Sequence, residues 1–209
     1  MSASKAVLSV VIPHSQEAVL TEEWCLAELK GIDSEIIVAP TWKDGYSRVN
    51  GEFVSFIDHD CVLSPGYFKK LLSVFKDNRT YRKLAMVTPV LGVNSWDIKV
   101  FGYILSPTSI FPSRIRSSSD VYLIQIGYIP GAIIRRSALE TASPIDGDHI
   151  IDSVNQSIRL WNKGQRIAID PSVTYVSTNA ELDLPFNVDR AVDAELEATI
   201  AMWKREMIG

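Results

Sequence analysis

Short apolar runs separated by polar turns predict a sheet whose strands begin early in the chain. Val7–Ile12, Ile36–Val38 and Val54–Ile57 are rich in β-branched and aromatic residues, and each is closely followed by a proline or an aspartate. Ala85–Val90 has the same character. Further strands or extended segments are predicted at Lys99–Leu105, Val121–Ile126, Ile167–Ile169 and Val173–Val176.

Helical periodicity appears between and after these strands. The clearest helix follows Ser64, an N-cap candidate, and Pro65, which fits the first helical position. Apolar residues at helical spacing give it one buried face: Phe68, Leu71, Leu72 and Phe75. Other expected helices are Thr21–Gly31 with Trp24, Cys25 and Leu29 buried, Ser153–Lys163 with Val154, Ile158 and Trp161 buried, and Asn187–Met207.

Strands that alternate with helices are typical of an α/β fold with a mostly parallel sheet. A chain of 209 residues fits one domain, or one domain with an appended tail. The segment Ser106–Asp120 is rich in serine and proline and is expected to form a mobile loop.

Composition narrows the function classes. The chain is 46% apolar and 22% charged, as in ordinary soluble proteins, and its formal net charge of −4 gives no basic footprint for nucleic acid. Two cysteines, Cys25 and Cys61, do not make a disulfide framework. No apolar run is long enough for a transmembrane segment, and the N-terminus lacks the layout of a signal peptide. The expected location is therefore the cytoplasm.

Two carboxylates, Asp58 and Asp60, directly follow the run Val54–Ile57, with His59 between them. Side chains two residues apart on an extended segment point the same way, and ligands of open α/β sheets bind outside the carboxyl ends of the strands. Mg²⁺ commonly uses one or two carboxylates together with substrate phosphates. The pair can therefore share a hard cation, although Asp58 could instead cap a turn and Asp60 be solvated.

An ordered set of motifs surrounds this pair: Val11-Ile12-Pro13, Gly51–Asp60 (GEFVSFIDHD), Gly131–Glu140 (GAIIRRSALE), Pro144-Ile145-Asp146, Asp152 and Arg159–Gly164 (RLWNKG). Over about residues 7–176 the set resembles the family 2 glycosyltransferases of the GT-A fold. The resemblance implies a single Rossmann-like α/β sandwich over residues 1–209. About residues 1–90 would form its nucleotide-binding half, about 91–180 its acceptor half, and about 185–209 a C-terminal helix.

The resemblance also implies roles for residues at the nucleotide end. Asp60 would coordinate Mn²⁺ or Mg²⁺ directly, and Asp58 would face the ribose or a metal-bound water. The loop that matches the family's P-T-Y-N-E would hold the nucleotide, largely through its backbone. The residues assigned to it are Pro13, His14, Ser15 and Glu17.

The end of the second strand departs from the family pattern. Where the family has V-D-D-G-S, this chain has Val38-Ala39-Pro40-Thr41-Trp42 and so lacks the carboxylate that reads the base. Trp42 could stack on a base, or it could be a core or surface residue. Lys43 and Arg48 could meet the phosphates or be solvated surface charges.

An inverting transferase needs a base for the acceptor hydroxyl. Counting back from Arg159–Gly164, Asp152 falls on the Glu of the family's Glu-Asp pair, and Ser153 falls on the Asp that is usually the base. Asp152, one position before Ser153, is therefore the first candidate for the base. Candidates in reserve are Asp148, Asp146 and His149.

The combined interpretation is a metal-dependent, inverting glycosyltransferase that acts on a nucleotide-sugar donor. Its acceptor would be an unknown glycan, protein or lipid, and a homodimer is one option for its assembly. A non-catalytic nucleotide- or sugar-binding module of the same fold is the first alternative, since V-D-D-G-S is missing and Ser153 replaces the usual base. A nucleotidyltransferase is the second, but Val11–Ser15 lacks the Gly-rich basic loop of that class.

Overall fold

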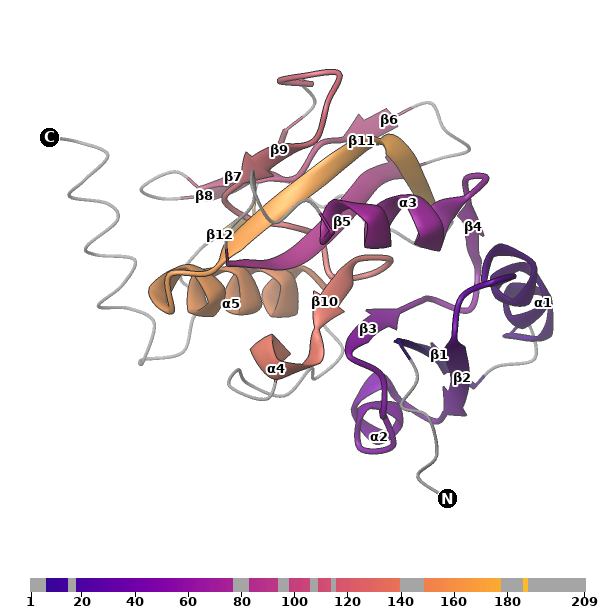
Figure 1. Cartoon of the computed structure of the whole chain (residues 1–209). Helices are drawn as coiled ribbons and strands as arrows, with labels where there is room; N and C mark the ends of the chain where they lie inside the picture. The colour runs from indigo at the N-terminus through magenta and orange to yellow at the C-terminus, as the bar shows by residue number, and fades with distance from the viewer. Residues whose placement is uncertain are drawn as a thin grey trace, which may run out of the picture.

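The computed structural model places a large mixed sheet at the centre of the chain (Figure 1). The residues it describes are 7–14, 18–76, 83–93, 98–105, 109–113, 116–139, 149–177 and 186–187. In spatial order the main strands are β2 (Ser34–Ala39), β1 (Leu8–Pro13), β3 (Phe53–Phe56), β10 (Ile133–Arg135), β5 (Leu84–Val93), β11 (Arg166–Ser177) and β4 (Cys61–Leu63).

Most central strands share one direction. β2, β1 and β3 pair in parallel, and so do β5 and β11. β10 lies between β3 and β5 and is antiparallel to both, so that the two parallel groups run the same way. This arrangement confirms the predicted α/β fold with a mostly parallel central sheet.

Two smaller strands branch from the main sheet. β6 (Ile98–Val100) pairs with β5, and β9 (Tyr122–Ile124) pairs with β11. A separate small sheet consists of β7 (Tyr103–Leu105), β8 (Ser109–Pro112) and β12 (Phe186–Asn187).

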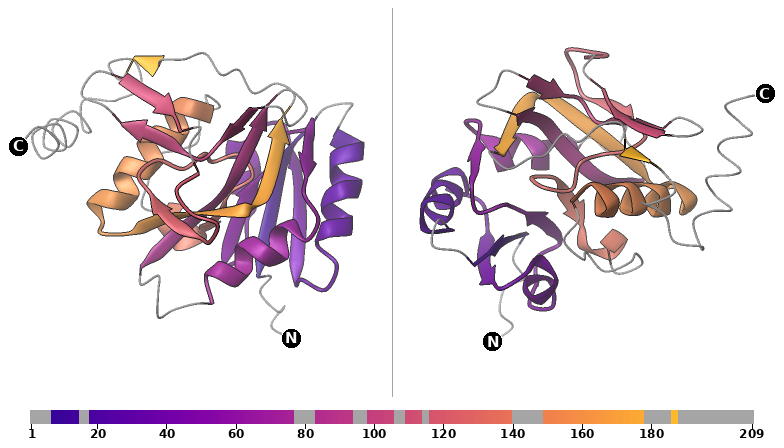
Figure 2. Two further views of the ribbon diagram at one scale, coloured as in Figure 1. Left: turned by 90° about the horizontal axis from the view of Figure 1, so that it is seen from above. Right: turned by 180° about the vertical axis from the view of Figure 1, so that it is seen from behind.

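Helices cover both faces of the main sheet (Figures 1 and 2). α1 (Ala18–Glu28) and α3 (Tyr67–Val74) lie on one face, and α2 (Trp42–Tyr46), α4 (Arg136–Leu139) and α5 (His149–Asn162) lie on the other. β1 can pack against helices on both faces, because alternate side chains of a strand point to opposite faces. Its Val10 packs in the same core cluster as Cys25 of α1, whereas Val11 packs in the cluster of Trp42 of α2.

The helix α3 confirms its predicted apolar stripe but corrects its predicted start. Phe68, Leu71 and Phe75 are buried as expected. The helix begins at Tyr67 after Gly66, whose φ of 72° is left-handed, so Ser64 is not the N-cap. The Ser64 hydroxyl instead accepts a hydrogen bond from the backbone N–H of Thr174 in β11.

The helix α1 buries a different face from the one predicted. Cys25 and Leu29 are buried, but Trp24 is 45% exposed. Residues four apart share a helix face, and the buried row is Thr21, Cys25 and Leu29, which leaves Trp24 to one side. Among the described residues, no helix is long and apolar enough to cross a membrane.

Several predicted boundaries also change. Ile167–Ile169 and Val173–Val176 are two parts of β11, joined through an irregularity between Asp170 and Thr174. Ser106–Asp120 is not a loop throughout, because β8 lies within it. Lys99–Leu105 is divided between β6 and β7, and α5 begins at His149, before the predicted start. Nearly all of the helix predicted for Asn187–Met207 lies outside the described residues.

Candidate active site

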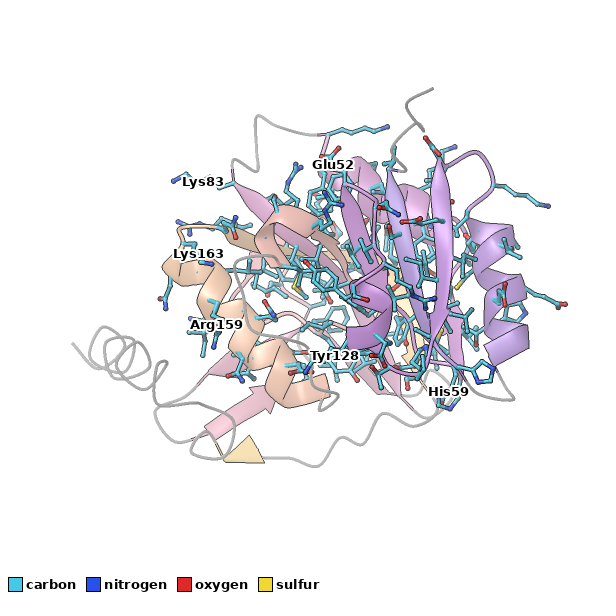
Figure 3. The ribbon with its side chains drawn as sticks, turned by 90° about the horizontal axis from the view of Figure 1, so that it is seen from below. Glu52, His59, Lys83, Tyr128, Arg159 and Lys163 are labelled. Carbon is cyan, nitrogen blue, oxygen red and sulfur yellow. The ribbon has the colours of Figure 1, made fainter. Side chains whose placement is uncertain are left out.

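The carboxyl ends of three parallel strands meet at one edge of the sheet. The backbone N–H of His14, just after β1, donates a 2.6 Å hydrogen bond to the carbonyl of Ala39 at the end of β2. The N–H of Ile57, just after β3, donates to the carbonyl of Val11 in β1. Figure 3 shows His59 at this edge and Glu52, which precedes β3, at the opposite edge. Asp58 and Asp60 therefore lie where an open α/β sheet binds its ligands.

The two aspartates differ in exposure. Asp58 is 7% exposed, whereas Asp60 is partly exposed to solvent. The phenolic hydroxyl of Tyr175 donates a 2.9 Å hydrogen bond to Oδ2 of Asp58 and accepts one of the same length from the Asp58 backbone N–H. One hydroxyl thus bridges the backbone and the side chain of Asp58.

Tyr175 was not expected at the site from the sequence. It belongs to β11 and is fully buried, and this burial, followed by the charge of Asp58, raises its pKa well above the usual value. The hydroxyl therefore stays protonated and remains a donor. A buried tyrosine usually has a hydrogen-bond partner for its hydroxyl. The tyrosine within the apolar run Val173–Val176 was therefore the one feature of the sequence that could have indicated a buried polar contact here.

A second hydroxyl holds the same turn from the other side. Thr21 of α1, which is 2% exposed, donates a 2.6 Å hydrogen bond from Oγ1 to the backbone carbonyl of His59. From the sequence, Thr21 is predicted only as a residue near the start of its helix. Asp58, His59 and Asp60 are thus held by side chains from two elements far apart in the sequence.

The donor set at this turn suits a hard cation. Carboxylate oxygens are the ligands that Mg²⁺ prefers, and one or two of them suffice when substrate phosphates complete the coordination. Within the part of the chain that the structure describes, no group of three or more His, Cys, Asp or Glu residues could hold a metal. Asp58 and Asp60 fit a cation that arrives with a diphosphate better than a metal enclosed entirely by protein.

At the nucleotide end, the predicted residues have different surroundings. Pro13 is half-buried and His14 is exposed beside the end of β2, while Ser15 and Glu17 lie outside the described residues. Lys43 is exposed on α2. Arg48 is exposed too, and its guanidinium donates a 2.6 Å hydrogen bond to the carbonyl of Val38 in β2.

The structure favours a packing role for Trp42 over base stacking. This tryptophan is 4% exposed, and its ring centroid lies 5.5 Å from that of Phe56. Its indole N–H donates a 3.4 Å hydrogen bond to the carbonyl of Ile57. A base could not reach the face of the ring without displacing core side chains.

The predicted base lies at the start of α5. Asp152 is in the first turn of this helix and is 7% exposed. Its neighbour Ser153 is 1% exposed, and its hydroxyl accepts a 2.9 Å hydrogen bond from the backbone N–H of Ile129. The reserve candidates Asp148 and Asp146 lie outside the described residues, as does the side chain of His149.

A chain of backbone contacts connects α5 to the strand that carries the aspartates. Ile129, held by Ser153, is followed by Pro130, which forms an isolated bridge with Phe56. The N–H of Gly131 donates a 2.7 Å hydrogen bond to the carbonyl of Phe56. The start of α5 is therefore tied to the end of β3, just before Asp58.

A hollow of about 820 Å³ lies at the opposite edge of the sheet, between the ends of α1 and α3. Its wall includes Arg135, which forms a 3.0 Å ion pair with Glu52 and lies 5.0 Å above the ring of Phe53. These contacts give Arg135 a structural role at the edge away from Asp58.

The sequence profile of glycosyl transferase family 2 matches residues 38–142, half of the 209-residue chain. This chain belongs to glycosyl transferase family 2. The matched part of the family 2 domain contains Asp58, Asp60 and Gly131, whereas Asp152 follows it. No curated protein matches the chain.

A solved structure of GalNAc-T7 with UDP, GalNAc and Mn²⁺ resembles this family 2 chain in fold. The TM-score is 0.53 at 10% sequence identity, over 85% of this chain and 44% of the GalNAc-T7 chain. This chain thus spans less than half the length of that protein. The likeness confirms the predicted GT-A fold.

Proposed function

We propose that this family 2 domain transfers a sugar from a nucleotide-diphospho-sugar donor, with Mn²⁺ or Mg²⁺ and with inversion at the anomeric carbon. The observation that carries the proposal is the position of Asp58 and Asp60 immediately after β3, at the edge where β1 and β2 also end. The GT-A fold and the family match support it. The acceptor would be a glycan, a protein or a lipid.

In this proposal the nucleotide lies across the ends of β1, β2 and β3. Asp60, the more exposed carboxylate, would hold the metal, and Asp58 would accept from the ribose or from a metal-bound water. The loop that begins at Pro13 and His14, and continues through Ser15 and Glu17, would border the nucleotide. Lys43 lies on α2, just after β2, and the guanidinium of Arg48 donates to Val38 of β2. Both side chains would bind the phosphates. When bound, the cation would stabilise the charge that develops on the leaving diphosphate.

Asp152 is the proposed base for the acceptor hydroxyl. A carboxylate in the first turn of a helix is stabilised as the anion by the helix dipole, which keeps it able to take a proton at neutral pH. Asp148 remains the reserve. About residues 1–90 would thus bind the donor and about 91–180 the acceptor.

One observation favours the alternative of a non-catalytic binding module. Ser153 occupies the position at which the family usually has its base, and its hydroxyl is buried and engaged with Ile129. If Asp152 does not take over the base function, nucleotide binding would persist without transfer.

A donor screen separates these functions. Release of sugar from UDP-, GDP-, dTDP- and CMP-sugars would be measured with Mn²⁺, with Mg²⁺ and with a chelator. We expect hydrolysis of at least one nucleotide-diphospho-sugar that depends on the cation. Cation-dependent nucleotide binding without hydrolysis or transfer would favour the binding module, and no nucleotide binding at all would contradict both.

A further inference from the structure

We infer that Tyr175 and Thr21 are positioning residues for the aspartate pair, which they hold in its binding geometry before any ligand arrives. The inference rests on the proposed function, since it concerns the same nucleotide and cation site. It adds two side chains from outside the motifs that define the site. One comes from β11, 117 residues from Asp58 along the chain, and the other comes from α1.

Tyr175 makes a double contact with Asp58. Its hydroxyl accepts from the backbone N–H of Asp58 and donates to the carboxylate of the same residue, with both distances 2.9 Å. A donor and an acceptor bond from one hydroxyl fix the carboxylate relative to its own backbone. Rotation of the Asp58 side chain would break the bond to Oδ2.

Tyr175 is itself held rigidly in the core. The residue is fully buried, and its ring lies 6.4 Å from the ring of Tyr67 and close to the backbone of Gly131. It lies in β11, which pairs with β5 along most of its length.

The peptide that follows Asp58 is held as well. The hydroxyl of Thr21 donates to the carbonyl of His59 at 2.6 Å, and strand pairing of Cys61 with Ser177 fixes the residue after Asp60. The turn is thus held at its beginning, its middle and its end. A site whose ligands are held in advance loses less conformational freedom on binding, so loss of either hydroxyl should weaken binding of the cation and nucleotide.

The test uses the whole chain with Mn²⁺ and UDP, GDP, dTDP or CDP, whichever binds best, measured by titration calorimetry. In Tyr175→Phe the ring stays and only the hydroxyl is lost. A hydrogen bond to a charged group contributes enough for a loss of affinity on the order of 10- to 100-fold. Thr21→Val removes a bond between neutral groups, and its expected loss is about two- to tenfold.

Tyr67→Phe is the matched control. Tyr67 is also fully buried, and its hydroxyl also donates to the protein, to the carbonyl of Gly131 at 2.7 Å. Its loss should lower stability by an amount similar to Tyr175→Phe without a comparable loss of affinity. This comparison separates positioning of Asp58 from general damage to the core.

A double-mutant cycle with Asp58→Ala, which removes the side-chain acceptor of the Tyr175 hydroxyl, gives a readout that a purely structural role would not change. If Tyr175 acts through Asp58, Tyr175→Phe should have little further effect on affinity once Asp58 is replaced, because coupled residues are not additive. If Tyr175→Phe binds as tightly as the wild type, or if the two effects in the cycle are fully additive, the inference is overturned while the proposed function stands. Absence of cation-dependent nucleotide binding in the wild type would overturn the proposed function, and the inference with it.

Discussion

The hydroxyl of Ser153 accepts a 2.9 Å hydrogen bond from the backbone N–H of Ile129, and this bond fixes the start of α5 against the segment that leads to Gly131. Ser153 is almost fully buried, so the side chain at the position of the usual family base is part of the packing. The nearest described carboxylate along the chain is Asp152, in the first turn of the same helix.

The first prediction is that Asp152→Asn abolishes sugar transfer while nucleotide binding survives. The base acts on the acceptor hydroxyl and not on the donor, so only the chemical step should suffer. Removal of a general base typically costs about 10²- to 10⁴-fold in rate. The turnover rate and the affinity for the nucleoside diphosphate would be measured on the same preparation.

Asp148→Asn serves as the comparison for this variant. If Asp148→Asn loses transfer and Asp152→Asn keeps it, the base is Asp148. If both variants remain active, the assignment of the base to a carboxylate of this segment is wrong.

The second prediction concerns Asp60, the more exposed member of the pair. Asp60→Ala should weaken nucleoside diphosphate binding in the presence of Mn²⁺ to the level measured with a chelator, because the cation would lose its direct protein ligand. Asp33→Ala, which removes a carboxylate from the opposite edge of the sheet, should leave this binding intact. Binding by Asp60→Ala that equals the wild type and needs no cation would remove the metal role.

The sequence could predict those features that depend on local periodicity. The stripe of α3 and the strands β1 and β3 follow from spacing within a few residues, and Asp58 and Asp60 could be placed because they follow the last of these strands directly. The GT-A fold could be predicted because the family's motifs occur in the same order along this chain.

Features that depend on the arrangement of distant elements could not be predicted. The partner of Asp58 is Tyr175, and the two meet only because β11 lies next to β4 and β5 in the sheet. Trp24 is exposed because neighbouring elements, not helical spacing alone, decide which face of α1 is buried. Ser109–Pro112 forms the strand β8 because β7 pairs with it, and this pairing outweighs the serine- and proline-rich local composition.

The third prediction concerns the two thiols. Burial raises the pKa of Cys25 to about 12, with a further contribution from Glu22 and Glu28, and burial also raises the pKa of Cys61. Only the thiolate reacts with iodoacetamide, so the native protein should show no alkylation at about pH 8 on a timescale that fully modifies it in urea. Mass spectrometry would count the adducts. Rapid modification of one cysteine in the native state would instead reveal local opening of α1 or β4.

The fourth prediction concerns acid sensitivity at Glu35 of β2. Burial opposes ionisation of this carboxyl, but hydrogen bonds from Ser9, Asn50 and Gly51 outweigh it and lower its pKa below the ordinary value of 4.5. A depressed pKa favours the folded state above the unfolded pKa, and this contribution is lost as the pH falls through the folded pKa.

Glu35→Gln should therefore flatten the fall of melting temperature between about pH 5 and 3. Glu23→Gln, on the exposed side of α1, is the control and should leave the slope unchanged. An identical pH profile for the wild type and Glu35→Gln would show that the hydrogen bonds around this carboxyl contribute nothing measurable.

The last prediction compares two glycines that share a left-handed backbone but differ in their surroundings. Gly131 has a φ of 77°, and a Cβ atom there would lie 2.8 Å from Cγ of Tyr175 and closer still to the hydroxyl of Tyr67. Gly31 has a φ of 81°, and apart from its own chain neighbours no atom lies within 4 Å of its Cβ position. An alanine at either position has the backbone cost of about 1–2 kcal/mol.

Only Gly131→Ala adds a clash in the core, which typically costs a further 1–3 kcal/mol or so. Urea unfolding should therefore show a larger loss of stability for Gly131→Ala than for Gly31→Ala. Because the clash involves the ring of Tyr175 as well as the hydroxyl of Tyr67, Gly131→Ala should also weaken cation-dependent nucleotide binding, which Gly31→Ala should leave intact. Equal losses of stability in the two variants would mean that the segment around Gly131 shifts to make room, and would remove the reason to expect a binding defect.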